Sequence, residues 1–218
     1  MTNHGILRAE REAVSELGRE LLANDLTKGS GGNVSVRDGD RVAVSPSGIP
    51  YEEVTPDIVP VVDLDGDVIE GEMEPSNETP MHTMIYDERP DVGGIVHTHS
   101  PYASTFASLG EPIPPTHYLI AYAGTEVPVA GYEPPGTEAL GRLAVEALGE
   151  EHNACLLQNH GVIAVGEDGD DAIEVAEMVE FVARIHYQAS SIGDPVEMDD
   201  EDLSYLIDMF GTYRKKST

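Results

Sequence analysis

The stretch Gly94-Ile95-Val96-His97-Thr98-His99-Ser100-Pro101 joins an apolar run to two histidines one residue apart. The apolar run predicts a buried strand. Because successive side chains of a strand point to opposite faces, His97 and His99 should emerge on the same side, with Thr98 turned away. The stretch therefore predicts a strand that ends in two converging imidazole rings.

A third histidine follows a second apolar strand much later in the chain. Residues 154–157 (Ala-Cys-Leu-Leu) run into Gln-Asn-His-Gly, which places His160 at the end of that strand. Three neutral imidazoles that leave one position open are the ligand set of a catalytic zinc. The alternative is three separately hydrogen-bonded histidines, which is the usual state of a lone histidine but less usual for a His-X-His pair on a strand. His97, His99 and His160 are therefore candidate metal ligands.

The composition is strongly acidic, which limits the possible partners. The 218 residues carry 41 Asp and Glu against 12 Lys and Arg, a formal charge of -29. A chain of this length is expected to form one domain, residues 1–218. It offers no basic patch for the phosphates of a nucleic acid, so we expect no nucleic-acid binding. Acidic residues spread along the whole sequence are typical of halophilic proteins, in which high salt screens the repulsion between surface charges. An ordinary acidic protein is the alternative.

Several features favour a soluble, cytoplasmic protein. No stretch approaches the roughly 18 consecutive apolar residues that a membrane span needs, and the N-terminus has no secretory signal pattern. Cys155 is the only cysteine, so no disulfide can form within the chain, which agrees with a reducing compartment. We therefore expect no association with a membrane.

Hydrophobic periodicity predicts helices and strands along the rest of the chain. Further strands are expected at residues 34–37, 41–44, 59–62, 68–70, 127–130 and 154–165, the last bent at residues 160–161. Helices are expected at residues 6–26, 78–87, 101–109, 137–148, 170–190 and 201–210.

Two loops rich in small residues flank the first expected hairpin. Residues 28–33 (Lys-Gly-Ser-Gly-Gly-Asn) precede it, and residues 45–51 (Ser-Pro-Ser-Gly-Ile-Pro-Tyr) follow it. The backbone N–H groups of such a loop can approach an anion, and Ser30 and Asn33 add side-chain donors. A glycine loop before a strand is more often a plain turn. Together the two loops still suggest a shared ligand.

Glu78 and His82 lie one helical turn apart at the start of the helix expected at residues 78–87. Ser76 or Asn77 can cap that helix. A carboxylate in the first turn of a helix suits the helix dipole without any further role for Glu78. His82 is either a partner or fourth ligand of the metal, or a buried, hydrogen-bonded histidine.

The motifs in their order resemble the class II aldolase family, typified by L-fuculose-1-phosphate aldolase. They are Gly-Ser-Gly-Gly-Asn-Val-Ser-Val-Arg, Ser-Pro-Ser-Gly-Ile-Pro-Tyr, Pro-Ser-Asn-Glu, His-Thr-His and Gln-Asn-His-Gly. The resemblance covers residues 6–213, nearly the whole chain. It implies a three-layer α/β/α fold around a central, mostly antiparallel sheet, assembled as a homotetramer with active sites between subunits.

The resemblance also implies roles for individual residues. His97, His99 and His160 take the positions of zinc ligands, with Mn²⁺ or Co²⁺ as alternative ions. Glu78 takes the position of the catalytic carboxylate, which also contacts the metal when substrate is absent. Tyr118 and Tyr213 fall near tyrosines that the family supplies from an adjacent subunit. The positions that hold the substrate phosphate are Ser30, Asn33, Ser47, Gly48, Ser76 and Asn77. Asn77 replaces a serine often seen in the family, which leaves the sugar preference open.

The expected reaction is reversible cleavage of a phosphorylated ketose, such as L-fuculose 1-phosphate, to dihydroxyacetone phosphate and a small aldehyde such as L-lactaldehyde. Such cleavage needs a lysine Schiff base or a metal acting as a Lewis acid. Lysine occurs only at Lys28, Lys215 and Lys216, so the metal is favoured. Glu78 would move the proton at the nucleophilic carbon, and Tyr118 would serve the aldehyde oxygen. Alternatives within the resemblance are a pentulose-phosphate 4-epimerase, a sugar-phosphate dehydratase and a non-catalytic, adducin-like binding module.

Overall fold

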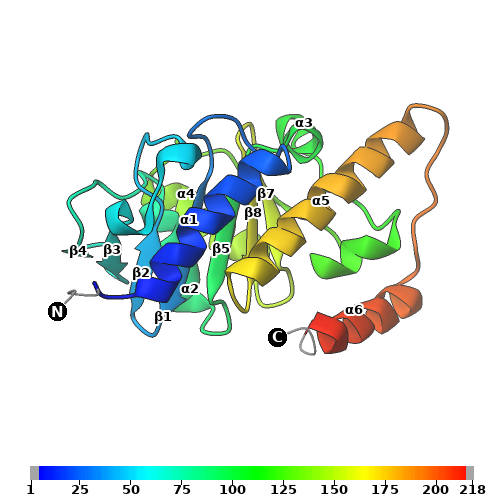
Figure 1. Cartoon of the computed structure of the whole chain (residues 1–218). Coiled ribbons are helices and arrows are strands. Elements are labelled where there is room, and N and C mark those ends of the chain that lie inside the picture. Colours follow the sequence, from blue (N-terminus) through cyan, green and yellow to red (C-terminus); the bar gives the residue numbers. More distant parts are fainter. Residues whose placement is uncertain (1–4, 215–218) are drawn as a thin grey trace.

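One eight-stranded sheet forms the centre of the molecule (Figure 1). The computed structural model describes residues 5–214, and the side chains as far as residue 212. In spatial order the strands are β4 (Val68–Glu70), β3 (Val61–Asp63), β2 (Arg41–Val44), β1 (Asn33–Asp38), β5 (Gly94–Thr98), β8 (Gly161–Gly166), β7 (Ala154–Leu157) and β6 (Val129–Ala130). All neighbours are antiparallel except β6 and β7. The expected, mostly antiparallel sheet is therefore confirmed.

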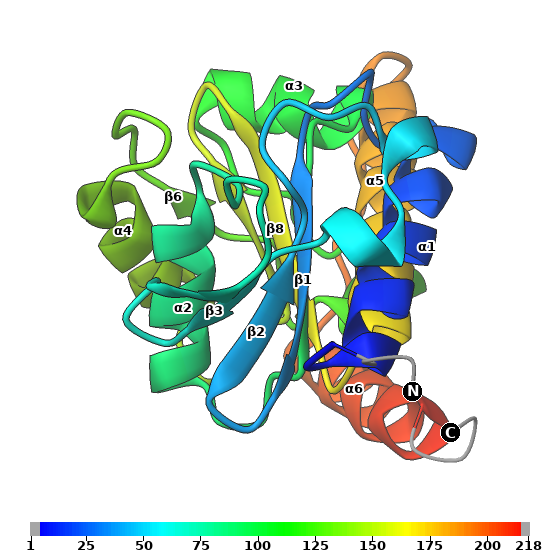
Figure 2. The same ribbon diagram turned by 60° about the vertical axis from the view of Figure 1, so that its left-hand side comes forward.

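Helices cover both faces of the sheet, which Figure 2 shows nearly edge-on. On one face lie α1 (Arg8–Ala23) and α5 (Gly169–Ser190), and on the other lie α2 (Thr79–Glu88) and α4 (Glu138–Leu148). The helix α3 (Pro101–Leu109) packs against α5 and the ends of β7 and β8, and α6 (Asp200–Arg214) packs against the 3-10 helix η3 (Tyr118–Tyr122). The three-layer α/β/α architecture expected from the sequence is confirmed.

Helical spacing of apolar residues explains how these helices attach to the sheet. In α1, Val14, Leu17 and Leu21 recur three and four residues apart and are fully buried or nearly so. The start of α4 is capped by Thr137, whose hydroxyl accepts the Leu140 N–H, and that of α5 by Asp168, whose carboxylate accepts the Asp171 N–H. The caps fix where both helices begin.

The alternation of side chains along the strands creates two apolar cores, one on each face of the sheet. Val34 of β1 and Val96 of β5 belong to the core under α1 and α5, whereas Ile95 of β5 belongs to the core under α2 and α4. Asn33 and His97 face each other across β1 and β5. His97 is two residues after Ile95, so both side chains point to the α2 side of the sheet. On that side, polar side chains take the place of apolar ones near the end of the strands.

Most expected elements are confirmed, with three differences. The last helix extends to Arg214, so Tyr213 lies within α6 rather than beyond it. The strand expected at residues 127–130 is reduced to β6, because Pro128 has no N–H for the ladder and Val127 instead pairs with Ile113. Three short 3-10 helices, Tyr51–Glu53, Pro56–Ile58 and η3, were not expected from the sequence. None of the helices within residues 5–214 is both long and apolar enough to cross a membrane.

Candidate active site

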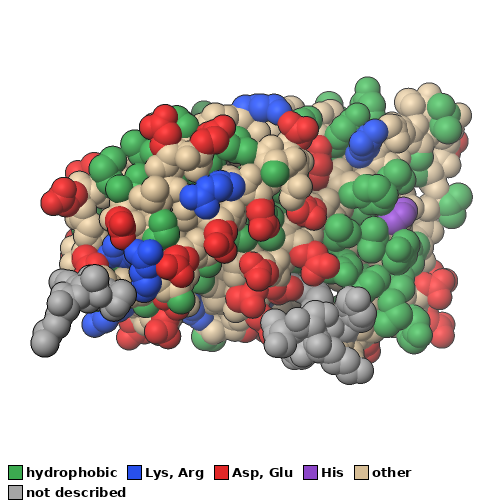
Figure 3. All heavy atoms as spheres, viewed as in Figure 1, with side chains coloured by type: hydrophobic (Ala, Val, Ile, Leu, Met, Phe, Trp, Pro, Cys, Tyr) green, Lys and Arg blue, Asp and Glu red, His purple; other side chains and the backbone are tan. Residues whose placement is uncertain are grey.

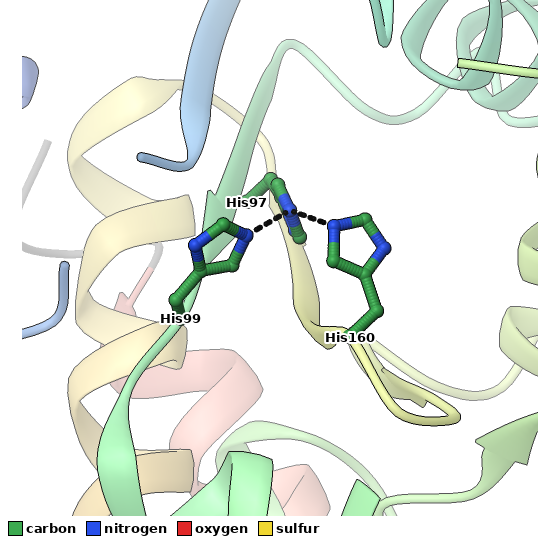
Figure 4. Close-up of side chains that lie close together, drawn as sticks. All are labelled: His97, His99 and His160. Carbon is green, nitrogen blue, oxygen red and sulfur yellow. Dashed lines mark hydrogen bonds between the residues drawn. The ribbon is translucent and has the colours of Figure 1, made fainter. Parts of the chain in front are cut away.

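Three imidazole rings meet where β5 ends beside the turn that joins β7 to β8 (Figure 4). His97 is in β5, His99 lies just after it, and His160 is in the turn. The Nε2 atom of His97 lies 3.1 Å from Nε2 of His99 and 3.2 Å from Nε2 of His160. The structure thus brings together the three histidines that the sequence singled out, from two places more than 60 residues apart in the chain.

The β7–β8 turn can approach β5 this closely because Gly161 has no side chain. A Cβ atom at this position would lie 2.2 Å from the backbone oxygen of Thr98 and 3.0 Å from the His99 ring. Real Cβ atoms essentially never approach another atom closer than 3.0 Å. Asn159, with φ 55°, takes the left-handed conformation that reverses the chain ahead of His160. The turn therefore holds His160 against His97.

The hydrogen bonds and burial of His97 leave its Nε2 atom free of a proton. Its Nδ1 atom lies 2.8 Å from the backbone oxygen of Val162, so Nδ1 carries the hydrogen and donates it. Burial, followed by the neighbouring His160 and His99, holds the pKa of His97 well below its usual value. Partial burial, followed by His160, also lowers the pKa of His99, although much of that residue faces the open pocket. A neutral imidazole is the form that binds metal ions.

The spacing of the nitrogen atoms fits a single small cation. Ligand nitrogens about 2.05 Å from a tetrahedral zinc lie about 3.3 Å from one another. The observed separations of 3.1 and 3.2 Å are close to that value, and all three ligand atoms lie within 4.8 Å of one another. The three histidines therefore form a group that could hold a metal ion, with two of the three separations close to the tetrahedral value.

Glu78 adds a carboxylate to the same point. The residue is 8% exposed and directly precedes α2. Its Oε2 lies 3.2 Å from Nε2 of His97, and its Oε1 lies 3.5 Å from Nε2 of His160. Among the described residues, no group forms a hydrogen bond with the buried Oε1. A buried oxygen without a partner beside three imidazoles is the arrangement that a bound divalent cation satisfies, so these residues fit one.

His82 lies behind this cluster and does not join it. The side chain is fully buried, and burial lowers its pKa to about 3, so the ring is neutral. Its Nε2 lies 2.5 Å from Oδ1 of Asn33, and its Nδ1 lies 2.7 Å from the Ser35 hydroxyl. Of the two alternatives left by the sequence, the structure shows the buried, hydrogen-bonded histidine.

A pocket of about 440 Å³ opens in front of the histidines and Glu78. Three segments form its walls: the glycine loop before β1, the loop after β2, and the residues ahead of α2. The positions at which the sequence predicted phosphate contacts all line it, together with His99 and His160: Ser30, Asn33, Ser47, Gly48, Ser76 and Asn77. The β1–β2 hairpin and the pairing of Pro46 with Pro75 hold the three segments side by side.

The pocket walls offer neutral donors for an anion. Within the described residues, its lining contains neither Lys nor Arg. Ser76 and Asn77 stand at the N-terminus of α2, where backbone N–H groups and the helix dipole favour negative charge. A phosphate would therefore be held by hydroxyl, amide and backbone N–H groups rather than by ion pairs.

Other residues of the lining were not identified from the sequence as part of a site. Tyr51 is 2% exposed, and its hydroxyl donates to the backbone oxygen of Gly32, which ties the two loops together. Burial raises the pKa of Tyr51 to about 12. Ser45 accepts the Val34 N–H, and Pro135 reaches the pocket from the loop before α4. Tyr51 belongs to a quoted motif, whereas no sequence pattern points to Pro135.

Of the two tyrosines predicted to act, the structure describes the side chain of Tyr118 only, and it does not reach this pocket in the single chain. Tyr118 is 49% exposed in η3 and stacks on Phe210 of α6, with 6.1 Å between ring centroids. It is absent from the described lining of the pocket. The backbone of Tyr213 is in α6, but its side chain lies outside the described part of the chain.

Comparison with known proteins points to one family. The family model "Class II Aldolase and Adducin N-terminal domain" matches residues 12–187. A 5-deoxy-D-ribulose 1-phosphate aldolase of Bacillus thuringiensis is 45% identical over 95% of this chain and 98% of its own. A 5-methylthioribulose-1-phosphate/5-deoxyribulose-1-phosphate aldolase of Rhodospirillum rubrum is 37% identical over 94% of this chain and 92% of its own. A solved L-fuculose 1-phosphate aldolase superposes with a TM-score of 0.91 at 39% identity, covering 93% of this chain and 96% of its own.

Proposed function

This chain belongs to the class II aldolase and adducin family, and we propose that it is a metal-dependent aldolase that cleaves a phosphorylated ketose. The observation that carries the proposal is the joint presence, at one pocket, of three converging imidazoles, two of which line it, a buried carboxylate and a set of anion donors. A binding module without catalysis would have no need of Glu78 Oε1, which is buried beside the imidazoles without a hydrogen-bond partner among the described residues.

The bound ion, which we propose to be zinc, would supply Lewis acidity for the ketone oxygen. His97, His99 and His160 would hold it, with Glu78 at its side. Cleavage breaks the bond between C3 and C4, and the electron pair stays on the dihydroxyacetone phosphate half. Glu78 then delivers a proton to C3, and the C4 hydroxyl proton passes to the Tyr118 hydroxyl of a neighbouring subunit as the aldehyde forms. In the reverse direction Glu78 removes the C3 proton.

The phosphate of the substrate fits the donor-rich end of the pocket. Ser30, Ser47, Gly48, Ser76 and Asn77 would bind it through hydroxyl, amide and backbone N–H groups. Asn33 would contribute through the one of its two amide hydrogens that Glu78 does not accept. This places the phosphate at the N-terminus of α2 and the reacting carbons beside Glu78.

Two of the substrates named for the relatives share one chemical feature. L-Fuculose 1-phosphate and 5-deoxyribulose 1-phosphate are both ketose 1-phosphates with a terminal methyl group. Both give dihydroxyacetone phosphate on cleavage, with L-lactaldehyde from the first and acetaldehyde from the second. The relative that is 45% identical favours the five-carbon sugar over the L-fuculose 1-phosphate expected from the sequence alone.

We also propose that the enzyme works as a homotetramer. Large apolar side chains are exposed along the second half of α5, the segment after it, and α6: Phe181, Tyr187, Ile192, Val196, Tyr205 and Met209. Figure 3 shows apolar side chains gathered at the right of the view, where the second half of α5 lies in Figure 1. Tyr118 is exposed as well and packs against α6. Such a surface suits a subunit contact, through which Tyr118 and Tyr213 would reach a neighbouring subunit's pocket. A cytoplasmic location and adaptation to high salt complete the proposal.

The proposal is tested by incubating zinc-loaded protein, in high salt, with ketose 1-phosphates and measuring aldehyde and dihydroxyacetone phosphate. We expect cleavage of 5-deoxyribulose 1-phosphate or L-fuculose 1-phosphate, with loss of activity on chelation. Formation of an epimer or a dehydrated product without any aldehyde would contradict the proposed reaction.

A further inference from the structure

A continuous hydrogen-bonded chain runs from the Glu78 carboxylate into the core beneath α2. The Asn33 Nδ2 group donates to Glu78 Oε2 over 2.8 Å. On its other side, Asn33 Oδ1 lies 2.5 Å from Nε2 of His82. His82 Nδ1 then meets the Ser35 hydroxyl, and the Tyr86 hydroxyl lies 2.9 Å from that same hydroxyl. Glu78 is therefore connected to the core through buried groups.

The fold explains why Asn33 is held on both sides. Glu78 directly precedes α2 and His82 follows four residues later, so the two side chains lie one helical turn apart on the same side. Asn33 is in β1, directly opposite His97 in β5. The Asn33 amide therefore lies between the Glu78 carboxylate and the His82 imidazole. Its strand, β1, is the neighbour of β5, which carries His97.

The Glu78 carboxylate determines which group donates and which accepts in each hydrogen bond of this series. An ionised carboxylate only accepts hydrogen bonds, so the Asn33 NH₂ group must face Glu78 and the Asn33 oxygen must face His82. His82 must then carry its hydrogen on Nε2. The neutral ring accepts from the Ser35 hydroxyl at Nδ1. With Glu78 ionised, this is the arrangement in which every hydrogen bond along this series runs from a donor to an acceptor.

The two carboxylate oxygens of Glu78 consequently differ. Oε2 is anchored by Asn33, whereas Oε1 is buried without a hydrogen-bond partner among the described residues. An anchored Oε2 fixes the carboxylate plane. Oε1, which would contact the ion when substrate is absent, is then the oxygen that handles the proton of the substrate.

We propose that Asn33 and His82 are positioning residues that orient Glu78 for proton transfer, an inference that rests on the proposed aldolase function. His82 acts only through Asn33, since it does not line the pocket and both of its ring nitrogens are engaged within the protein. Asn33 has a second role at the phosphate, so His82 is the residue that isolates the positioning effect.

The first test needs neither metal nor substrate. Protein labelled with ¹⁵N-histidine is examined by NMR through the long-range couplings of the imidazole ring, and the His82 signal is assigned by its disappearance in His82→Gln. We expect the neutral Nε2–H tautomer for His82, opposite to the Nδ1–H tautomer expected for His97. An Nδ1–H tautomer at His82 overturns the proposal, because the Asn33 amide would then be turned the other way.

The second test separates kcat from KM. His82→Phe removes the donor but keeps the ring shape, and we expect kcat to fall about 10- to 100-fold, with KM and bound metal unchanged. His82→Gln restores an N–H near the Nε2 position and should recover most of kcat. Ile85→Val, a buried change on the same helix, controls for loss of packing and should retain kcat.

The outcomes separate this inference from the proposed function. Wild-type kcat in His82→Phe, or a kcat in His82→Gln as low as in His82→Phe, overturns the positioning role. If His82→Phe does not fold, Asn33→Asp replaces it: a carboxylate facing Glu78 should lower kcat at least as much, and an unchanged kcat overturns the proposal. Wild-type protein that cleaves no ketose phosphate refutes the proposed function, whereas the tautomer of His82 is still decided by NMR.

Discussion

Substitution of Gly161 by alanine tests how the fold assembles the histidine cluster. A Cβ at this position would lie 2.2 Å from the backbone oxygen of Thr98, against a practical lower limit of 3.0 Å. The β7–β8 turn must therefore move away from β5 by about 0.8 Å, and His160 must move with it. Metal–ligand distances tolerate only about 0.2 Å. We expect divalent metal affinity to fall at least about 100-fold, with a stability cost of about 1–3 kcal/mol, typical of overpacking.

The assay is a titration of metal-free protein with Co²⁺, followed by visible absorption, with circular dichroism to verify folding. Gly193→Ala is the matched control, because nothing lies within 4 Å of a Cβ there. It should bind Co²⁺ like the wild type. A folded Gly161→Ala protein with wild-type Co²⁺ affinity would refute the idea that the glycine sets the spacing of His160 and His97.

Three further outcomes are expected from changes elsewhere in the molecule. Glu78→Gln should keep bound zinc but lower kcat by about 10²- to 10⁴-fold, the usual contribution of a general acid–base; near wild-type turnover by a steady-state assay would remove Glu78 from that role. Chelation with EDTA should abolish cleavage and lower the Tm, and re-addition of Zn²⁺ should restore both; a Tm insensitive to metal would argue against a folded-state site. Glu177→Gln should raise the Tm at low salt and much less in multimolar KCl, because burial, followed by the nearby Glu20 and Glu174, raises the pKa of Glu177. A raised carboxyl pKa means that ionisation opposes folding as the pH rises through that pKa, and salt weakens the repulsion.

The prediction for Glu177 is controlled by a substitution at an exposed carboxylate. Glu150→Gln changes an exposed carboxylate after α4 and should leave the Tm almost unchanged at either salt concentration. If Glu177→Gln lowers the Tm at low salt, packing or hydrogen bonding of this carboxylate outweighs charge repulsion. A wild-type Tm that does not rise with KCl would count against adaptation to high salt.

The sequence predicted that His97 and His99 would lie together, because the geometry of this pair is local. Alternation along β5 determines that His97 and His99 share a side, and their Nε2 atoms do lie 3.1 Å apart. The approach of His160 depends on β8 pairing with β5, a long-range contact that no local pattern encodes. The sequence made His160 a candidate ligand by its place after a second strand, but it did not predict the strand pairing that brings this residue to His97.

The connection between Asn33 and Glu78 could not be predicted from the sequence. The resemblance assigned Asn33 to phosphate, whereas the structure shows its amide between Glu78 and His82. That arrangement requires the register of β1 against β5 and the placement of α2 over the same face. The exposure of Tyr118 could not be predicted from the sequence either, because it depends on how α6 packs against η3. In both cases tertiary packing decides which partner a side chain meets.

The central claim is that one divalent cation is bound by three imidazoles beside Glu78. The most direct measurement is anomalous diffraction at the zinc edge from crystals of zinc-loaded protein. We predict one peak per chain, bonded to Nε2 of His97, His99 and His160 at about 2.0–2.1 Å. Crystals that hold no ion among these rings, despite zinc in excess, would contradict the account.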